Sequence, residues 1–176
     1  MRLPRGSVVL ARGMAWTELR SLAALCRRQR LLLFVGGDGR AALRLRAGLH
    51  VPERGATGLL PFLRGRGPLS VAVHGRAGSA RGRRLRADTA LISPIFPTVS
   101  HPGGRALGPH GWAWLARHAG RPAVALGGVN GATARRVPRL AVGFAAIGGL
   151  NEGAGNPLFL AGRVREGWPS RRAFTT

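Results

Sequence analysis

The chain contains no lysine and no tyrosine, and only 6 of its 176 residues are Asp or Glu. All 28 of its Lys or Arg residues are therefore arginines, and the formal net charge is +22. The missing side chains exclude lysine Schiff-base chemistry, lysine general bases and tyrosine acids. The single cysteine, Cys26, excludes a disulfide framework and any zinc site built from several cysteines. We therefore expect a protein of a reducing compartment, with the cytoplasm as its location.

Long apolar runs and aromatic side chains are also scarce. The longest apolar runs, such as Leu31 to Val35, are far shorter than the roughly 20 residues that span a bilayer, so no membrane partner is expected. Aromatic residues make up 6% of the chain, which leaves few rings to stack on bases, and no helix-turn-helix, zinc-finger or RNP motif occurs. The arginines are spread along the whole chain. A coding bias toward arginine explains them better than specific nucleic-acid binding.

Short aliphatic runs recur along the chain, most of them followed by a segment with helical spacing. Near-continuous apolar runs are typical of parallel strands that are buried on both faces. Seven consecutive units favour a (β/α)8 TIM barrel over a doubly wound sheet. We expect this α/β domain to occupy residues 1–165, followed by a basic C-terminal tail at 166–176. The predicted strands are Ser7–Arg12, Leu31–Gly36, Ala47–Val51, Leu69–His74, Thr89–Ile92, Ala123–Leu126 and Val142–Ile147, and the predicted helices include Trp16–Gln29, Pro109–Ala119 and Ala132–Leu140.

Two consecutive predicted strands end on a pair of glycines. One closes with Gly127-Gly128 and the other with Gly148-Gly149, directly after Ile147. In barrels, the loops after the last strands often bind phosphate through backbone N–H groups, and glycine lets the backbone approach the anion. A tight turn would explain either pair alone. Two pairs at consecutive strand ends favour a small phosphorylated ligand.

A stiff loop over residues 93–104 follows the strand Thr89–Ile92. It carries three prolines and brings two hydroxyls and an imidazole close together, at Thr98, Ser100 and His101. Such groups donate to phosphate or assist a leaving group. The alternative is a proline-rich surface connection, but the loop belongs to the catalytic face of the predicted barrel, which favours a ligand site.

These segments together resemble the thiamine phosphate synthase family and its sister TenI-like thiazole tautomerases, which are (β/α)8 barrels. The resemblance implies a transferase of thiamine biosynthesis that joins hydroxymethylpyrimidine pyrophosphate to thiazole phosphate, with Mg²⁺ helping pyrophosphate to leave. The alternative is a divergent tautomerase-like or non-catalytic relative that binds thiazole phosphate. The matching segments are SPIFPTVSHPGG (93–104) with Leu107-Gly108, PAVALGGV (122–129) and VGFAAIGGL (142–150), supported by GLHVP (48–52) and SVAVH (70–74).

The resemblance assigns roles residue by residue. Arg12 and His101 fall at the pyrophosphate end and are the catalytic candidates, and Asp38 matches one of two magnesium carboxylates. On the thiazole-phosphate side, the matching residues are Thr98, Ser100, Gly127, Gly128, Ile147 and Gly148.

The chain departs from the family pattern at the pyrophosphate end. The family's glutamine and lysine beside the arginine are Leu10 and Met14 here, its second magnesium aspartate is Gly55, and its fifth-strand serine is Ala72. The tautomerase histidine falls at Pro94, so that role would have to move to His101 or His74.

The resemblance begins at the family's second strand, which leaves the barrel without its first strand and helix. A missing strand exposes two unpaired edges. Either the chain is truncated, or another segment or a further subunit of a homo-oligomer closes the gap. For the tail from Asn151 to Thr176, the sequence predicts a short helix at 158–165 and no strand.

Overall fold

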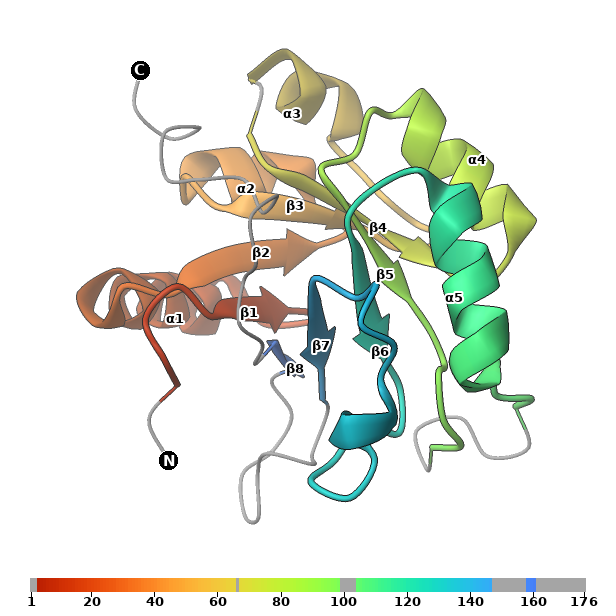
Figure 1. Cartoon of the computed structure of the whole chain (residues 1–176). Helices are drawn as coiled ribbons and strands as arrows, with labels where there is room; N and C mark the ends of the chain where they lie inside the picture. The colour runs from red at the N-terminus through yellow and green to blue at the C-terminus, as the bar shows by residue number, and fades with distance from the viewer. Residues whose placement is uncertain (1–2, 66, 99–103, 147–157, 161–176) are drawn as a thin grey trace.

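A computed structural model describes residues 3–65, 67–98, 104–146 and 158–160, and it has an α/β fold (Figure 1). Seven parallel strands curl into a half-barrel in sequential order, with helices on the outside. This is consistent with a TIM-like barrel that lacks a part, and the described strands do not form a complete barrel. The strands are β1 Val8–Ala11, β2 Leu32–Gly36, β3 Gly48–Val51, β4 Leu69–Val73, β5 Thr89–Ile92, β6 Ala123–Leu126 and β7 Gly143–Ala145, which confirms all seven predicted runs.

The helices α1 Trp16–Gln29 and α5 Gly108–Ala119 confirm two of the predicted helices. Helix α1 begins where the Glu18 carboxylate accepts from the Ala15 N–H at 3.0 Å, and it ends at Arg30, which has left-handed backbone angles. Three shorter helices, α2 Gly39–Arg44, α3 Leu59–Gly65 and α4 Arg76–Arg84, follow β2, β3 and β4. No helix in the described ranges is long and apolar enough to cross a membrane.

The predicted helix at 132–140 is wrong. Only a 3-10 turn, η1 Ala134–Arg136, forms there. Its C-cap, Val137, is extended, with φ −66° and ψ 127°, because the residue before a proline avoids the helical region and Pro138 follows.

The strand side chains alternate between two apolar clusters. The outward cluster packs strand residues such as Val71 and Val73 against helix residues such as Cys26 and Trp112. The inward cluster fills the concave side of the sheet, and its buried members are Val8, Leu10, Phe34, Leu91, Val124 and Ala145. This two-residue period is what a sheet buried on both faces requires.

An eighth strand, β8 Leu158–Leu160, pairs antiparallel with β1 at the edge of the sheet. The predictions of a helix from residue 158 and of no strand in the tail are therefore wrong for these residues. The segment gives the unpaired backbone groups along Val8–Leu10 hydrogen-bonding partners that an edge strand otherwise lacks. Backbone Cα atoms of β7 and β8 also approach within 8 Å, so β8 lies in the gap between the two ends of the parallel sheet. The predicted basic tail at 166–176 lies outside the described residues.

We expect removal of residues 158–176 to lower the free energy of unfolding and to promote aggregation, since it would expose the edge of β1. Urea denaturation and light scattering would measure both effects. The matched control removes only residues 166–176 and leaves β8 in place. Equal stability and solubility of the two truncated proteins would contradict a closing role for β8.

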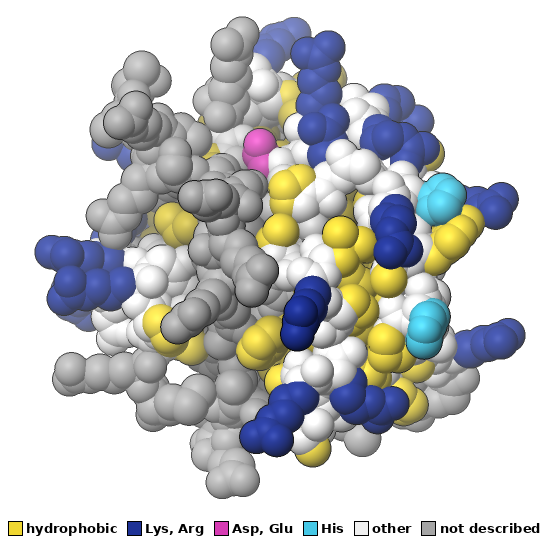
Figure 2. All heavy atoms as spheres, viewed as in Figure 1, with side chains coloured by type: hydrophobic (Ala, Val, Ile, Leu, Met, Phe, Trp, Pro, Cys, Tyr) yellow, Lys and Arg dark blue, Asp and Glu magenta, His cyan; other side chains and the backbone are white. Residues whose placement is uncertain are grey.

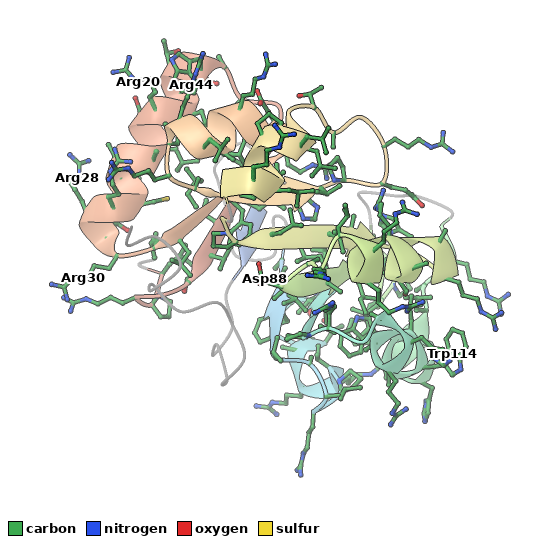
Figure 3. All side chains as sticks on the ribbon, turned by 90° about the horizontal axis from the view of Figure 1, so that it is seen from above. Arg20, Arg28, Arg30, Arg44, Asp88 and Trp114 are labelled. Atoms are coloured by element: carbon green, nitrogen blue, oxygen red, sulfur yellow. The ribbon has the colours of Figure 1, made fainter. Side chains whose placement is uncertain are left out.

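Basic side chains are scattered over much of the face seen in Figure 2. From above, Arg20, Arg28 and Arg44 point away from the sheet, on the outer side of α1 and α2 (Figure 3). Most of the few carboxylates in the described residues accept hydrogen bonds from backbone N–H groups. Asp88, for example, accepts from the Leu69 N–H at the start of β4 at 2.7 Å.

Candidate functional site

The carboxyl ends of the seven parallel strands share one edge of the curled sheet, as they do at the catalytic face of α/β barrels. Neighbouring strands therefore place the residues that follow them side by side at this edge. Going along the sheet from β1 to β6, these residues are Arg12, Asp38, Glu53, His74, Ser93 and Gly127.

The turn after β6 is built from Gly127 and Gly128, which have φ of +94° and +64°. A Cβ atom on Gly127 would lie 2.8 Å from Pro94, and one on Gly128 would overlap the Pro97 carbonyl oxygen. The loop after β5 also bonds to this turn, because the Phe96 N–H donates to the Gly127 carbonyl at 3.1 Å. Both glycines are thus required by positive φ and by close approach of two backbones.

This packing brings two of the predicted binding segments together. Thr98, which carries a hydroxyl group, directly follows Pro97 and therefore lies next to the turn after β6. The Gly128 N–H is a backbone donor of this turn. Arg136 adds a positive charge nearby, since its guanidinium lies 5.3 Å above the Phe96 ring. A backbone donor beside a cation suits an anionic group.

The same turn is held rigid by its own side chains. The Asn130 carboxamide oxygen accepts from the backbone N–H groups of Ala132 and Thr133, each at 3.0 Å. The Thr133 hydroxyl donates to the Gly128 carbonyl at 2.8 Å. The geometry of the turn is therefore fixed before any ligand arrives, which favours binding.

Four of the predicted site residues lie outside the described residues. They are Ser100, His101, Ile147 and Gly148, and their roles stay predictions.

Asp38 acts as the N-cap of α2. Its Oδ1 atom accepts from the Arg40 and Ala41 N–H groups at 2.9 and 3.0 Å. Among the described residues, no group of three or more His, Cys, Asp or Glu side chains could hold a metal ion. Mg²⁺ is usually held by one or two carboxylates together with phosphate oxygens and water, so a role of Asp38 toward this metal stays a prediction. Asp38 itself is exposed at the predicted edge.

Arg12 lies at the end of β1 and crosses toward β2. Its Cγ atom would lie 2.8 Å from a Cβ built on Gly36, the last residue of β2. Arg12 therefore comes close to the segment that carries Asp38, as expected for two residues of one site. Its side chain is exposed, so its charge is available to a ligand.

Sequence reasoning missed a second arginine at this edge. Arg81 of α4 donates to two backbone carbonyls, to Glu53 through Nη1 and to Ala72 through Nη2 at 3.0 Å. It ties the loop after β3 to strand β4. No local pattern in the sequence indicates this, because Arg81 is one of several arginines on its helix and its partners are distant carbonyls.

A polar pair lies inside the sheet below these arginines. His50 of β3 is buried, and its Nδ1 atom lies 2.9 Å from the Ser70 hydroxyl of β4. Burial lowers the pKa of His50 from 6.5 to about 3, and the charges of Arg12, Arg81 and His74 add to this shift. His50 is therefore neutral near pH 7, and its hydrogen bond to Ser70 gives it a structural role.

The curled parallel sheet defines an α/β protein, and the described candidate residues lie at the carboxyl ends of its strands. A model of the thiamine monophosphate synthase family matches residues 11–152, and the chain belongs to this family. This confirms the resemblance seen in the sequence and supports a function related to thiamine biosynthesis.

One solved structure similar to the chain is thiamine phosphate pyrophosphorylase from Pyrococcus furiosus. The two are 21% identical with a TM-score of 0.63, over 79% of this chain and 71% of that chain. At this identity the likeness shows the fold alone. No curated protein matches the chain.

Proposed function

We propose that the protein is a thiamine phosphate synthase-like transferase of the cytoplasm, which joins hydroxymethylpyrimidine pyrophosphate to thiazole phosphate. We also propose that its half-barrel corresponds to most of a (β/α)8 TIM barrel. The observation that carries the function is the packing of the Gly127-Gly128 turn against Pro94 and Pro97, within a chain that belongs to the family. That packing assembles the phosphate end of the proposed site.

In this proposal the thiazole phosphate is held by Thr98, Ser100, the Gly127-Gly128 turn and Ile147-Gly148. Backbone N–H groups at such turns bind anions without reorganisation. The roles toward the pyrophosphate belong to Arg12 and His101 in this proposal. The bond between the pyrimidine methylene carbon and pyrophosphate breaks, the bonding electron pair leaves with pyrophosphate, and the thiazole nitrogen donates its lone pair to that carbon. An arginine suits the departing anion because its planar guanidinium binds two oxygens at once.

A second candidate is a non-catalytic or tautomerase-like relative that binds thiazole phosphate but does not release pyrophosphate. One observation favours it: Oδ1 of Asp38, the predicted magnesium carboxylate, already accepts two backbone N–H groups as the cap of α2. In this reading the phosphate end is kept and the pyrophosphate end is lost.

Incubation of the purified protein with both substrates, with and without Mg²⁺, tests the proposal by the formation of thiamine phosphate. We expect product with the wild type, and for Arg12→Gln a KM for the pyrophosphate substrate raised by about tenfold, since one charge-assisted contact is lost. The matched control is Arg28→Gln, because Arg28 points outward from α1. Measurable thiazole phosphate binding without any product would overturn the synthase and favour the second candidate.

A further inference from the structure

His74 lies on the concave side of the sheet at the carboxyl end of β4. Side chains on a strand alternate between its two faces, so Ser70, Ala72 and His74 share one face. Ser70 contacts the buried His50, and Ala72 is the register partner of Leu91, which belongs to the inward cluster. His74 follows the last residue of β4 and lies on the same inward face as Ser70 and Ala72. Its ring is exposed there.

One ring nitrogen of His74 is held by the neighbouring strand. Its Nδ1 atom lies 2.9 Å from the Ser93 carbonyl oxygen and 3.2 Å from the Ser93 hydroxyl. A carbonyl oxygen only accepts, so Nδ1 must carry the proton and donate it. In the neutral imidazole the lone pair is then on Nε2, which makes this atom a hydrogen-bond acceptor of fixed position.

Two arginines, Arg12 and Arg81, supply hydrogen-bond donors at this edge of the sheet. Arg12 and Arg81 both lie near enough to the buried His50 for their charges to lower its pKa, as His74 does. Guanidinium groups have no acceptor. The Nε2 lone pair of His74 can thus accept a hydrogen bond at this edge of the sheet, which the arginines cannot do.

Along the row of strand ends, His74 lies between the residues that follow β1 and β2 and the turn that follows β6. Arg12 and Asp38 follow β1 and β2 on one side, and the turn Gly127-Gly128 follows β6 on the other. If these two sides hold the two anionic groups, as the proposed function requires, the heterocyclic part of the ligand lies between them. His74 follows β4 and faces that space.

We propose that His74 contacts the ligand through Nε2, accepting a hydrogen bond from a heteroaromatic ring that carries an amino or ring N–H donor. This inference rests on the proposed function and deepens it, because the pyrimidine substrate carries such an amino group. His74 is then a specificity-determining residue. Sites built to bond a substrate N–H discriminate strongly against analogues that lack it.

Two substitutions separate the roles of the ring nitrogens. In His74→Asn the amide N–H can still donate to the Ser93 carbonyl, but the acceptor at the Nε2 position is lost. In His74→Gln the carboxamide oxygen reaches the Nε2 position and restores an acceptor. The matched control is His118→Asn, because His118 lies exposed on α5 with its Nδ1 atom 2.8 Å from the Trp114 carbonyl, the same arrangement away from the site.

Binding of hydroxymethylpyrimidine pyrophosphate and of its analogue without the amino group is measured by calorimetry for each variant. We expect His74→Asn to bind the amino ligand about tenfold more weakly than the wild type, because one hydrogen bond is lost, and to bind the analogue unchanged. His74→Gln should recover most of the loss, and His118→Asn should match the wild type. Equal losses for both ligands would overturn the assignment.

Nitrogen-15 spectra of the histidine rings of the free wild-type protein give a second test that needs no variant. A proton on Nδ1 of His74 supports the proposal, and a proton on Nε2 overturns it. Failure of the proposed function and failure of the role of His74 give different results. If the wild type binds neither pyrimidine, the proposed function fails and this inference falls with it, whereas binding that is indifferent to His74→Asn removes only the inference.

Discussion

Substitution of Gly128 by valine is expected to abolish measurable binding of thiazole phosphate. The residue has φ +64°, and a β-branched side chain in this conformation costs about 1 to 3 kcal/mol on its own. The new Cβ would also overlap the Pro97 carbonyl oxygen and lie 2.8 Å from the Phe96 Cβ. The loop after β5 must then move away from the turn after β6. Calorimetric titration with thiazole phosphate measures the loss, and urea denaturation measures the accompanying destabilisation.

The chain offers a matched control three residues further on. Gly131 lies exposed in the same loop, its φ is not positive, and a Cβ built there meets nothing within 4 Å. We therefore expect Gly131→Val to bind and to unfold like the wild type. A Gly128→Val protein that still binds thiazole phosphate with wild-type affinity would show that the ligand lies elsewhere.

The strands could be predicted from the sequence because each is a short apolar run buried on both faces. Strand β1, for instance, is a continuous run of four buried residues, Val8–Ala11. Helix α1 was equally visible, with Leu19, Ala23 and Cys26 at helical spacing along its buried face. These signals are local, and they survive in the folded protein because the tertiary contacts agree with them.

Non-local structure accounts for the errors. Strand β8 owes its conformation to the edge of β1, some 150 residues earlier in the chain, and the triplet Leu158–Leu160 by itself suits a helix or a strand. The predicted helix at 132–140 is wrong for a local reason instead. Its helical spacing was outweighed by Pro138 and by the Asn130 side chain, which directs the chain into a turn.

The candidate site also combines features that the local sequence indicates with features that depend on distant contacts. The sequence predicts a phosphate-binding turn at Gly127-Gly128, yet it could not show that these glycines accommodate the loop at 94–97. Asp38 was recognised as an acidic residue after a strand, but its use as an N-cap depends on how α2 begins. The fixed ring of His74 depends on Ser93, 19 residues away, and no spacing rule connects the two.

Acidification is expected to destabilise the folded protein through His50. Burial, assisted by the charges of Arg12, Arg81 and His74, lowers the pKa of His50 to about 3, whereas in the unfolded chain it has its ordinary value of 6.5. Between these two pH values the unfolded chain binds a proton that the folded chain does not. Stability is therefore fully present above the unfolded pKa and is lost as the pH falls toward 3, with a limiting slope of about 1.4 kcal/mol per pH unit.

Urea denaturation between about pH 7 and about pH 5 isolates this effect when the wild type is compared with a His50 variant, because Asp and Glu side chains hardly titrate in that range and the other histidines are common to both proteins. In His50→Asn the amide can keep a hydrogen bond to the Ser70 hydroxyl but cannot take up the proton, so we expect its stability to depend much less on pH, whatever its absolute stability. The control, His110→Asn, removes an exposed imidazole of α5 and should keep the wild-type slope. Parallel pH profiles for the wild type and His50→Asn would mean that His50 is not the group that couples folding to protons, and that the polar pair with Ser70 is open to water.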